Sequence, residues 1–371
     1  MEENWVTEGY AAPNKKTYPW QWLWDSCFHS LIWLELGRPD RAEQELTEIF
    51  RPQSDSGFVP HINYVCDPDI HSDLWGRSHG SSITQPPMYG HAIAALHRAG
   101  IHIDQALLSS ATAGLSFLIN ERARHDSGLL LLCHPWESGA DDSPRWDDFC
   151  PGGFDKERWK QQKNILVETI EQTSDGSPIR NPEFQVASIG FNALVAFNAR
   201  ELAEVTGDTS MTDSANEITH AIAERWDESS STWIDAGPHA DKSGSCRTLD
   251  ALLPLLVVEE KQLPPKLVEQ FDSVEAFKGQ FGPRGVHLKE KVFNPKQYWR
   301  GPVWPQLSYL ISLAVSRFDL HTAQQLTLAT ANGVQTSGCA EYWNPETGEG
   351  LGAIPQSWAG LSLVSTKRLL S

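Results

Sequence analysis

The chain has 371 residues, of which 40% are hydrophobic and 21% charged, and its formal net charge is −18. This is the composition of an ordinary globular protein with a sizeable core, and such a negative surface excludes nucleic acid and anionic membranes as expected partners. No run of about 18 apolar residues occurs, so no membrane span is expected.

Helical periodicity dominates the chain. Apolar residues recur at i, i+3 and i+4 in five pairs of segments, at 24–36 and 39–50, 90–99 and 104–119, 184–205 and 211–226, 248–257 and 265–271, and 303–316 and 320–331. Residues 357–370 predict a terminal helix, and residues 164–171 predict a further, less clearly periodic one. No convincing run of alternating strand residues occurs.

Long polar loops rich in Trp and Pro separate these pairs, at 51–85, 125–155, 227–247, 274–302 and 334–356. Long ordered loops in a compact domain are usually functional. Short turns at one end and long loops at the other predict an all-α ring of helical hairpins, with a site at the long-loop end. No linker interrupts the pattern, so a single domain over residues 1–371 is expected.

The most informative loop is residues 136–146, WESGADDSPRW, which places acidic side chains between two tryptophans. Sugar C–H groups pack on indole faces, and a desolvated carboxylic acid keeps its proton near neutral pH. The loop therefore predicts carbohydrate chemistry. Asp141 and Asp142 are adjacent, so one is expected to act and the other to be structural. The remaining acids are interpreted as a solvated rim, with a calcium site as the alternative despite its poor match to an EF-hand loop: Glu137, Asp147 and Asp148.

Three further motifs precede predicted helices. Residues 18–26, YPWQWLWDS, hold four aromatics in seven residues, which favours a sugar platform, and Asp25 is either a helix cap or a site residue. Gln85 can donate to and accept from sugar hydroxyls, although its motif also suits an ordinary helix start. In YWRGPVW, residues 298–304, Arg300 either contacts an anion or pairs with a buried acid.

A second carboxylate is expected in residues 340–348, AEYWNPETG. Glu346 lies in a Pro-x-x-Gly turn and is expected to face water. Glu341 lies beside two aromatics and is the preferred candidate, and Trp358 is placed to close the pocket. Asp141 and Glu341 are 341 − 141 = 200 positions apart, so only a closed fold brings them together.

Other site classes lack their signatures. The six cysteines, at 27, 66, 133, 150, 246 and 339, include no CxxC pair and are expected to be free thiols in a reducing cytoplasm. The N-terminus has no secretory pattern, which also favours a cytoplasmic location. No GxSxG, Walker or HExxH motif occurs, so neither a cofactor nor a metal is expected.

Together the five motifs resemble the bacterial branch of glycoside hydrolase family 63, and within it the mannosylglycerate and glucosylglycerate hydrolases. The trehalases of family 37 are more distant. The resemblance, from about Tyr18 to Trp358, implies an (α/α)6 toroid that hydrolyses a small α-glucoside or α-mannoside with inversion. It implies Asp141 as general acid and Glu341 as general base, with carboxyl groups about 6.5–9.5 Å apart. The expected sugar-binding residues, from the resemblance and from the same motifs, are Tyr18, Trp22, Trp24, Asp25, Gln85, Trp136, Tyr298, Trp299, Gly301, Trp304 and Trp358.

One departure from the family concerns the start of the chain. A helix usually precedes the Tyr-Pro-x-x-Trp motif, and only 17 residues precede Tyr18 here. Five pairs and one single helix leave the last helix without a partner, so the toroid is expected to lack its first helix and to be incomplete near residues 357–370.

Two alternatives stay open at this point. One is a non-catalytic sugar-binding toroid. The other is a different (α/α)6 enzyme, such as a trehalase-like hydrolase, or a sugar epimerase or polysaccharide lyase with His61 or His91 as base. The expected partner is a small-molecule carbohydrate substrate, and the oligomeric state is left open.

Overall fold

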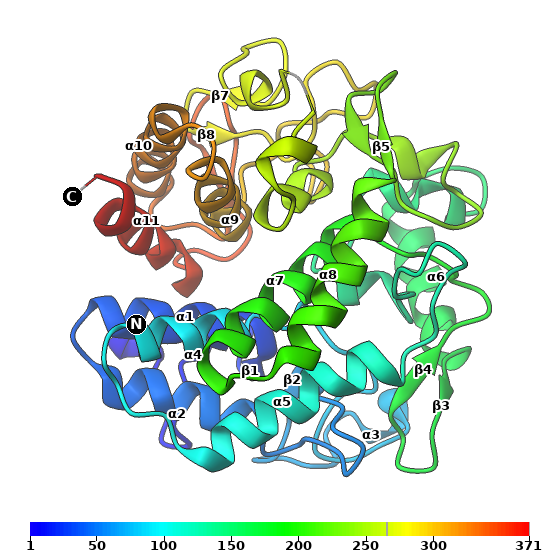
Figure 1. The fold of residues 1–371 in the computed structure, drawn as a ribbon, viewed down its shortest axis with the longest axis vertical. Helices are drawn as coiled ribbons and strands as arrows, with labels where there is room; N and C mark the ends of the chain where they lie inside the picture. Colours follow the sequence, from blue (N-terminus) through cyan, green and yellow to red (C-terminus); the bar gives the residue numbers. More distant parts are fainter. Residues whose placement is uncertain (265, 371) are drawn as a thin grey trace.

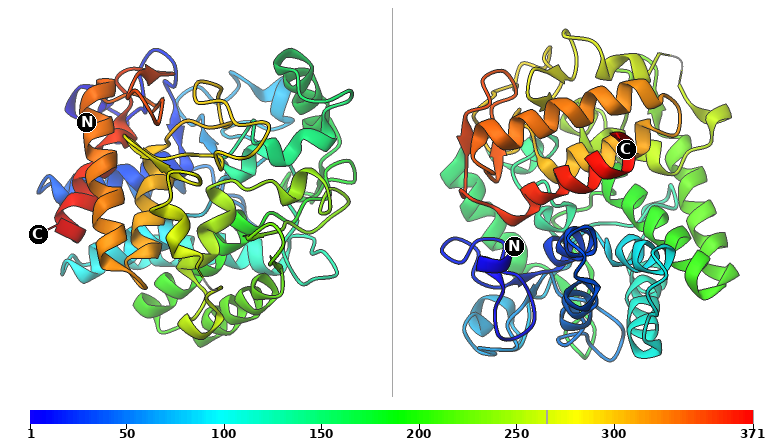
Figure 2. Two further views of the ribbon diagram at one scale, coloured as in Figure 1. Left: turned by 90° about the horizontal axis from the view of Figure 1, so that it is seen from above. Right: turned by 90° about the vertical axis from the view of Figure 1, so that its left-hand side faces the viewer.

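The computed structural model describes residues 1–264 and 266–370 and shows a ring of helices (Figure 1). The inner ring consists of α1 (Leu23–Glu35), α4 (Tyr89–Arg98), α7 (Ile189–Thr206), the 3-10 helix η5 (Asp250–Leu256), α9 (Pro305–Val315) and α11 (Leu361–Leu370). Each of these packs against the next, and α11 packs against α1. The chain thus passes once around the ring, and the N-terminal segment and α11 lie on the same side of the molecule (Figures 1 and 2).

Four outer helices cover the inner ring: α2 (Pro39–Ile49), α5 (Gln105–Asn120), α8 (Thr209–Ala223) and α10 (Leu320–Ser337). The burial pattern separates the two layers. Every residue of α9 is buried, whereas α2 buries only four of its eleven residues. A helix that is apolar all round belongs inside a protein, and one with a single apolar stripe belongs at its surface. The expected helical hairpins are confirmed in this arrangement.

The ring closes where the sequence predicted it to be incomplete. α11 lies between α9 and α1 and also packs on α10. The N-terminal segment joins this closure: the N–H of Ser357 donates to the carbonyl of Pro13, and Asn14 donates to the carbonyl of Pro355 at 2.7 Å. The inner ring is therefore complete within the described residues, although α11 has no outer helix of its own among them.

Side-chain caps explain where several helices begin. In each case an oxygen of the cap accepts a hydrogen bond from a backbone N–H of the first turn, and the caps of α5, α7, α8 and α10 are Asp104, Ser188, Asp208 and Asp319. The helix predicted from residue 184 therefore begins only at Ile189. Residues before the cap are extended instead, with Val186 and Ala187 in β-bridges.

Three other predictions on helices are corrected. The helix predicted over 164–171 is α6 (Lys156–Glu168), capped by Asp155. The segment 248–257 forms the 3-10 helix η5 and not an α-helix. Pro254 lies inside it, and proline has no N–H for the hydrogen bond that an α-helix needs. Of the segment 265–271, residue 265 lies outside the described residues, and only Val268–Phe271 form a short 3-10 helix, η7.

Short elements lie between and before the main helices, and periodicity predicted none of them except the helical turn at 357–360, which falls within the predicted terminal helix. Five antiparallel two-stranded pairs are β1 (Gln21–Trp22) with β2 (Ile62–Asn63), β3 (Glu171–Gln172) with β4 (Pro178–Arg180), β5 (Trp226–Asp227) with β6 (Thr232–Trp233), β7 (Lys278–Gly279) with β8 (Gly282–Pro283), and β9 (Tyr342–Trp343) with β10 (Gly350–Leu351). The remaining helical turns are α3 (Ser72–Trp75), η1 (Glu2–Asn4), η2 (Pro135–Ser138), η3 (Pro144–Phe149), η4 (Ser243–Ser245), η6 (Glu260–Gln262) and η8 (Ser357–Gly360).

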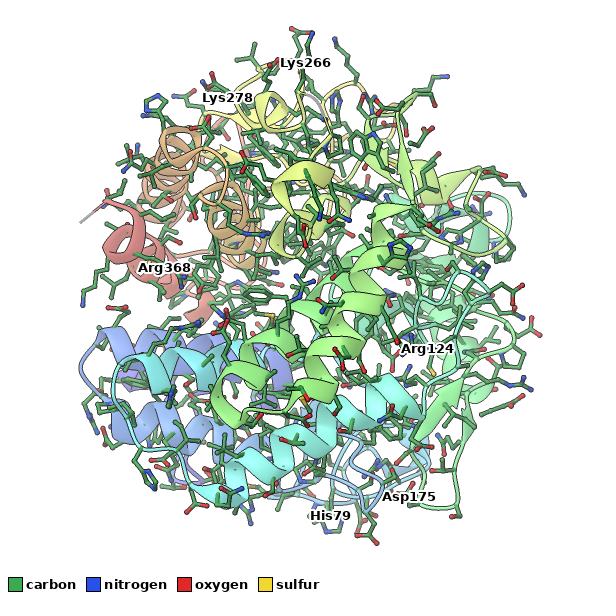
Figure 3. The ribbon with its side chains drawn as sticks, in the orientation of Figure 1. His79, Arg124, Asp175, Lys266, Lys278 and Arg368 are labelled. Carbon is green, nitrogen blue, oxygen red and sulfur yellow. The ribbon has the colours of Figure 1, made fainter. Side chains whose placement is uncertain are left out.

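The six cysteines are free thiols, as expected. No helix within residues 1–264 and 266–370 is both long enough and apolar enough to cross a membrane. Charged side chains such as Asp175 and Lys266 lie at the edge of the molecule in the view of Figure 3. A charged group that is instead buried inside the ring therefore needs a specific explanation.

Candidate active site

A cavity opens at the end of the ring where the inner helices begin. Its empty space, including the part open to solvent, amounts to about 410 Å³. Trp24 and Asp25 enter it from the first turn of α1, Gln85 from the segment before α4, and Trp358 from η8 just before α11. Its lining consists of Pro13, Tyr18, Trp22, Trp24, Asp25, Gln85, Gly139, Asp141, Tyr298, Trp299, Glu341, Gln356 and Trp358.

Ten of the thirteen residues singled out in the sequence line this cavity, including both Asp141 and Glu341. The other three lie outside its lining. Trp304 stacks behind Trp299, with ring centroids 3.8 Å apart and planes 7° apart. Gly301 lies against the backbone of Asn294, where a Cβ has no room. Trp136 packs with a neighbouring aromatic cluster that includes Trp75.

Three lining residues were missed in the sequence, namely Pro13, Gly139 and Gln356. Gln356 had a usable signal, because an amide side chain two positions before Trp358 in an aromatic loop suits a sugar site. Gly139 lies in the motif that nominated the acid. Pro13 had no signal, since it enters the site only through the path of the N-terminal segment.

Asp141 is a carboxyl of the cavity whose surroundings favour its protonated form. Burial raises its pKa to about 7. Among neighbouring groups, the charge of Lys163 lowers this pKa and that of Asp142 raises it; the hydroxyl of Tyr298 lowers it and the charge of Glu341 raises it. The Tyr298 hydroxyl lies 3.3 Å from Oδ2 of Asp141. A carboxyl with such a pKa holds a proton near neutral pH and can donate it.

The adjacent acids Asp141 and Asp142 lie in different surroundings. Asp142 is buried and accepts from Nζ of Lys163 at 2.6 Å, whereas Asp141 lines the cavity. The expected solvated rim is wrong for Glu137, which is 0% exposed and paired with Arg122. The reason is that Glu137 accepts from three backbone or side-chain partners at the core of the loop.

Arg300 pairs with a carboxylate of the protein, which is one of the two interpretations offered from the sequence. Its NH1 and NH2 groups each lie 2.7 Å from a carboxylate oxygen of Asp147, and its guanidinium lies over the ring of Phe154. NH1 also points toward the carbonyl of Asp142 at 3.4 Å. A buried, bidentate Arg–carboxylate pair is geometrically specific, so this pair fixes the loop that carries Asp141.

Gly139 is required by its position as well as by its backbone. Its φ is +72°, and a Cβ there would clash with the indole of Trp24. We expect Gly139→Ala to lower the free energy of unfolding by about 1–3 kcal/mol, measured by urea denaturation. Gly153→Ala is the matched control, because Gly153 has φ +87° with no atom near the added Cβ. Equal losses in the two variants would show that contact with Trp24 adds nothing.

Glu341 is held by groups that stabilise its charged form. Tyr18 donates its hydroxyl to Oε1 at 2.9 Å, and the N–H of Ala353 donates to Oε2 at 2.8 Å. Burial raises the pKa of Glu341, while these two hydrogen bonds lower it. Trp358 fixes the backbone by donating from Nε1 to the carbonyl of Glu341 at 3.0 Å. Glu346, by contrast, is exposed, as expected, and pairs with Arg284.

Aromatic rings form much of the cavity wall. Trp299 has a left-handed backbone, with φ 58°, which is unusual for a bulky residue. In this conformation the ring of Trp299 stacks on that of Trp304. Trp304 in turn stacks on Tyr342, with ring centroids 4.6 Å apart. Trp24 and Trp358 meet edge to face at 6.0 Å. The wall thus offers flat apolar faces beside carboxylates, as sugars require.

Asp25 is a third buried carboxyl in the cavity, and burial raises its pKa well above the usual range. It makes no side-chain cap to α1, so the capping interpretation is wrong. Gln85 takes part in that start instead: its Oε1 lies 3.4 Å from the N–H of Trp24. The alternative interpretation, that Asp25 is a site residue, is supported because Asp25 lines the cavity.

The two histidines considered as alternative bases do not line the cavity. His61 is buried against Ser81, and burial lowers its pKa to about 3. His91 lies 2.7 Å from the Tyr309 hydroxyl and 3.1 Å from Glu201. Both are thus satisfied structural residues. Across the described part of the chain, no group of three His, Cys, Asp or Glu side chains could hold a metal ion.

Known proteins that are similar to this chain are glycoside hydrolases. Residues 18–359 match the mannosylglycerate hydrolase MGH1-like glycoside hydrolase domain. A mannosylglycerate hydrolase from Thermus thermophilus is 27% identical, over 96% of this chain and 97% of that protein. A glucosylglycerate hydrolase from Mycolicibacterium hassiacum is also 27% identical, over 95% and 92%.

Solved structures confirm the fold. The crystal structure of a family 63 mannosylglycerate hydrolase from Thermus thermophilus in complex with glucose matches with a TM-score of 0.83 and 25% identity, over 99% of this chain and 98% of that one. The same enzyme with Tris and D-glycerate matches with a TM-score of 0.84 and 24% identity, over the same shares. The (α/α)6 toroid predicted from the sequence is therefore confirmed.

Proposed function

The chain belongs to the mannosylglycerate hydrolase MGH1-like glycoside hydrolases of family 63, and on that premise we propose that it hydrolyses a small α-glucoside or α-mannoside with inversion. The observation that carries this proposal is the pair formed by Asp141 and Glu341. They come from loops 200 positions apart, and both line one aromatic cavity.

Asp141 is the proposed general acid. Its pKa of about 7 leaves it substantially protonated near neutral pH, so it can donate to the glycosidic oxygen as the bond from that oxygen to the anomeric carbon breaks. The departing alcohol keeps this proton. The Tyr298 hydroxyl, 3.3 Å from Oδ2, is placed to orient the carboxyl.

Glu341 is the proposed general base. It takes a proton from water as the water oxygen bonds to the anomeric carbon on the face opposite the leaving group. An α-glycoside then gives a β-sugar, and the proton count balances because Glu341 gains the proton that Asp141 loses. This geometry requires the two carboxyl groups to be about 6.5–9.5 Å apart, which leaves room for one water.

The substrate is proposed from the relatives and from the cavity. The relatives are named for mannosylglycerate and glucosylglycerate, and mannose or glucose presents a C–H face suited to Trp24, Trp299 or Trp358. Asp25 and Gln85 supply polar groups for sugar hydroxyls. We infer that the whole chain is one catalytic domain and that its free thiols suit the cytoplasm.

A substrate panel tests this proposal. The purified protein is incubated with glucosylglycerate, mannosylglycerate, trehalose and kojibiose, and the released hexose is measured. Release from at least one substrate, abolished by Asp141→Asn, supports a hydrolase that uses this site. Binding of these sugars by calorimetry without any release would instead favour the non-catalytic sugar-binding toroid.

The acid limb of the pH profile should depend on Tyr18. Glu341 must be ionised to act, so activity is lost as pH falls through its pKa. Tyr18→Phe removes a hydrogen bond to the charged form, which raises the pKa of Glu341 and moves the acid limb of kcat/KM to higher pH by about one unit. Tyr342→Phe is the control, since the Tyr342 hydroxyl is not part of the cavity. An acid limb unchanged by Tyr18→Phe would contradict the assignment of Glu341.

A further inference from the structure

One face of α6 holds the loop that carries Asp141. Trp159 and Lys163 are four residues apart and therefore point to the same side of the helix. Trp159 donates from Nε1 to the carbonyl of Asp141 at 3.0 Å, and Lys163 donates from Nζ to Oδ1 of Asp142 at 2.6 Å. The helix thus forms a hydrogen bond with the backbone of Asp141 and a salt bridge with the side chain of Asp142.

Lys163 is fixed in this position from several sides. It is only 7% exposed, and its Nζ lies 5.5 Å from the ring centroid of Trp136 and 5.9 Å from that of Trp159. The ring nitrogen Nε2 of His134 lies 2.9 Å from the Lys163 carbonyl. A buried charge needs a partner, and the partner of this ammonium in its salt bridge is Asp142.

The pair places opposite charges beside the acid. Lys163 stabilises the ionised form of Asp141, and Asp142 destabilises it. Other titratable groups near Asp141 are the hydroxyls of Tyr298 and Tyr18 and the carboxylate of Glu341. Arg300 approaches the Asp142 carbonyl, but its charge is engaged by the carboxylate of Asp147. Charges interact strongly in such a water-poor setting.

We propose that the buried Lys163–Asp142 ion pair is a positioning device for Asp141, with two charges of opposite sign that act against each other at its carboxyl group. This inference rests on the proposed role of Asp141 as the acid. The pair does not touch the reacting atoms, since neither residue lines the cavity. It acts through the loop and through its field at Asp141.

The test is a double-mutant cycle read as pH profiles of kcat/KM. Asp141 must be protonated, so its pKa sets the alkaline limb. Lys163→Met removes a positive charge, which raises that pKa and moves the limb up by about one pH unit; Asp142→Asn removes a negative charge and moves it down by about one unit. The double variant should return close to wild type, and Lys163→Arg should retain the wild-type limb.

A merely structural role would lower the rate or the stability without shifts of opposite sign. Shifts in the same direction, or none, would overturn the proposal. If Lys163→Met does not fold, Asp142→Asn alone decides, since no downward shift would refute the inference.

A second readout separates this inference from the proposed function. The carboxyl carbons of aspartates labelled with 13C are titrated by NMR without substrate, and the Asp141 signal is assigned with Asp141→Asn. Opposite shifts in the midpoint of Asp141, in a protein that cleaves no glycoside, would uphold the ion-pair effect and reject hydrolysis. Hydrolysis with no change in the midpoint would reject the ion-pair effect alone.

Discussion

Asp141→Asn is expected to lower kcat on an α-glucoside or α-mannoside by about 10²–10⁴-fold, the usual contribution of a positioned acid. The amide cannot donate the proton that the departing alcohol needs. It is close in size to the carboxyl and can keep the contact with Tyr298, so folding should be preserved. The measurement is steady-state hydrolysis of the substrate identified by the panel, together with thermal unfolding.

A control and a second substrate sharpen this prediction. Asp148→Asn removes a carboxylate from the same segment, but Asp148 is exposed and does not line the cavity, so activity should be unchanged. An α-glycosyl fluoride needs little protonation of its leaving group, and Asp141→Asn should keep most of its activity on it. If Asp141→Asn lowered activity equally on the α-glycosyl fluoride and on the α-glucoside or α-mannoside, the role of Asp141 as a general acid would be contradicted.

Glu341→Gln is expected to cause a loss of about 10²–10⁴-fold that no leaving group relieves. The amide can still interact with Tyr18 and the N–H of Ala353, but it cannot remove a proton from water. Activity on the α-glycosyl fluoride should therefore fall as far as activity on the α-glycoside. The two catalytic variants are thus distinguished by their response to the same pair of substrates.

Glu346→Gln is the matched control for Glu341→Gln. Glu346 lies five positions later in the same loop, is exposed and pairs with Arg284, so its loss should leave kcat unchanged. A large loss with Glu346→Gln and none with Glu341→Gln would transfer the base from one glutamate to the other and would refute the role proposed for Glu341.

The helices α1 and α9 were readable from the sequence because they are mostly apolar and almost wholly buried. The pattern located α1 and α9 to within two residues. It failed where local chemistry overrides periodicity. Pro254 lies in an apolar segment that forms the 3-10 helix η5 and not an α-helix. Ser188 caps α7, so the apolar residues before it, which the pattern assigned to the helix, are extended.

The sequence predicted which motifs contribute to the site, but not how their side chains are arranged in space. Aromatic residues beside acids identified Asp141 and Glu341 as candidates, because such loops suit sugars. The residues themselves, apart from the family resemblance, could not say which of Asp141 and Asp142 lines the cavity, since Asp142 is engaged by Lys163, 21 positions away along the chain. α6 was located only in part because the helix is polar, with few buried residues, so periodicity carries little signal there.

The anomeric configuration of the first sugar released tests the central claim most directly. Proton NMR follows the hydrolysis of the α-glycoside at times shorter than those of mutarotation. We expect the β-anomer to appear first and then to equilibrate with the α-anomer, because Glu341 activates water on the face opposite the leaving group. Initial release of the α-anomer would indicate retention and would contradict the assignment of Asp141 and Glu341 as an inverting acid and base.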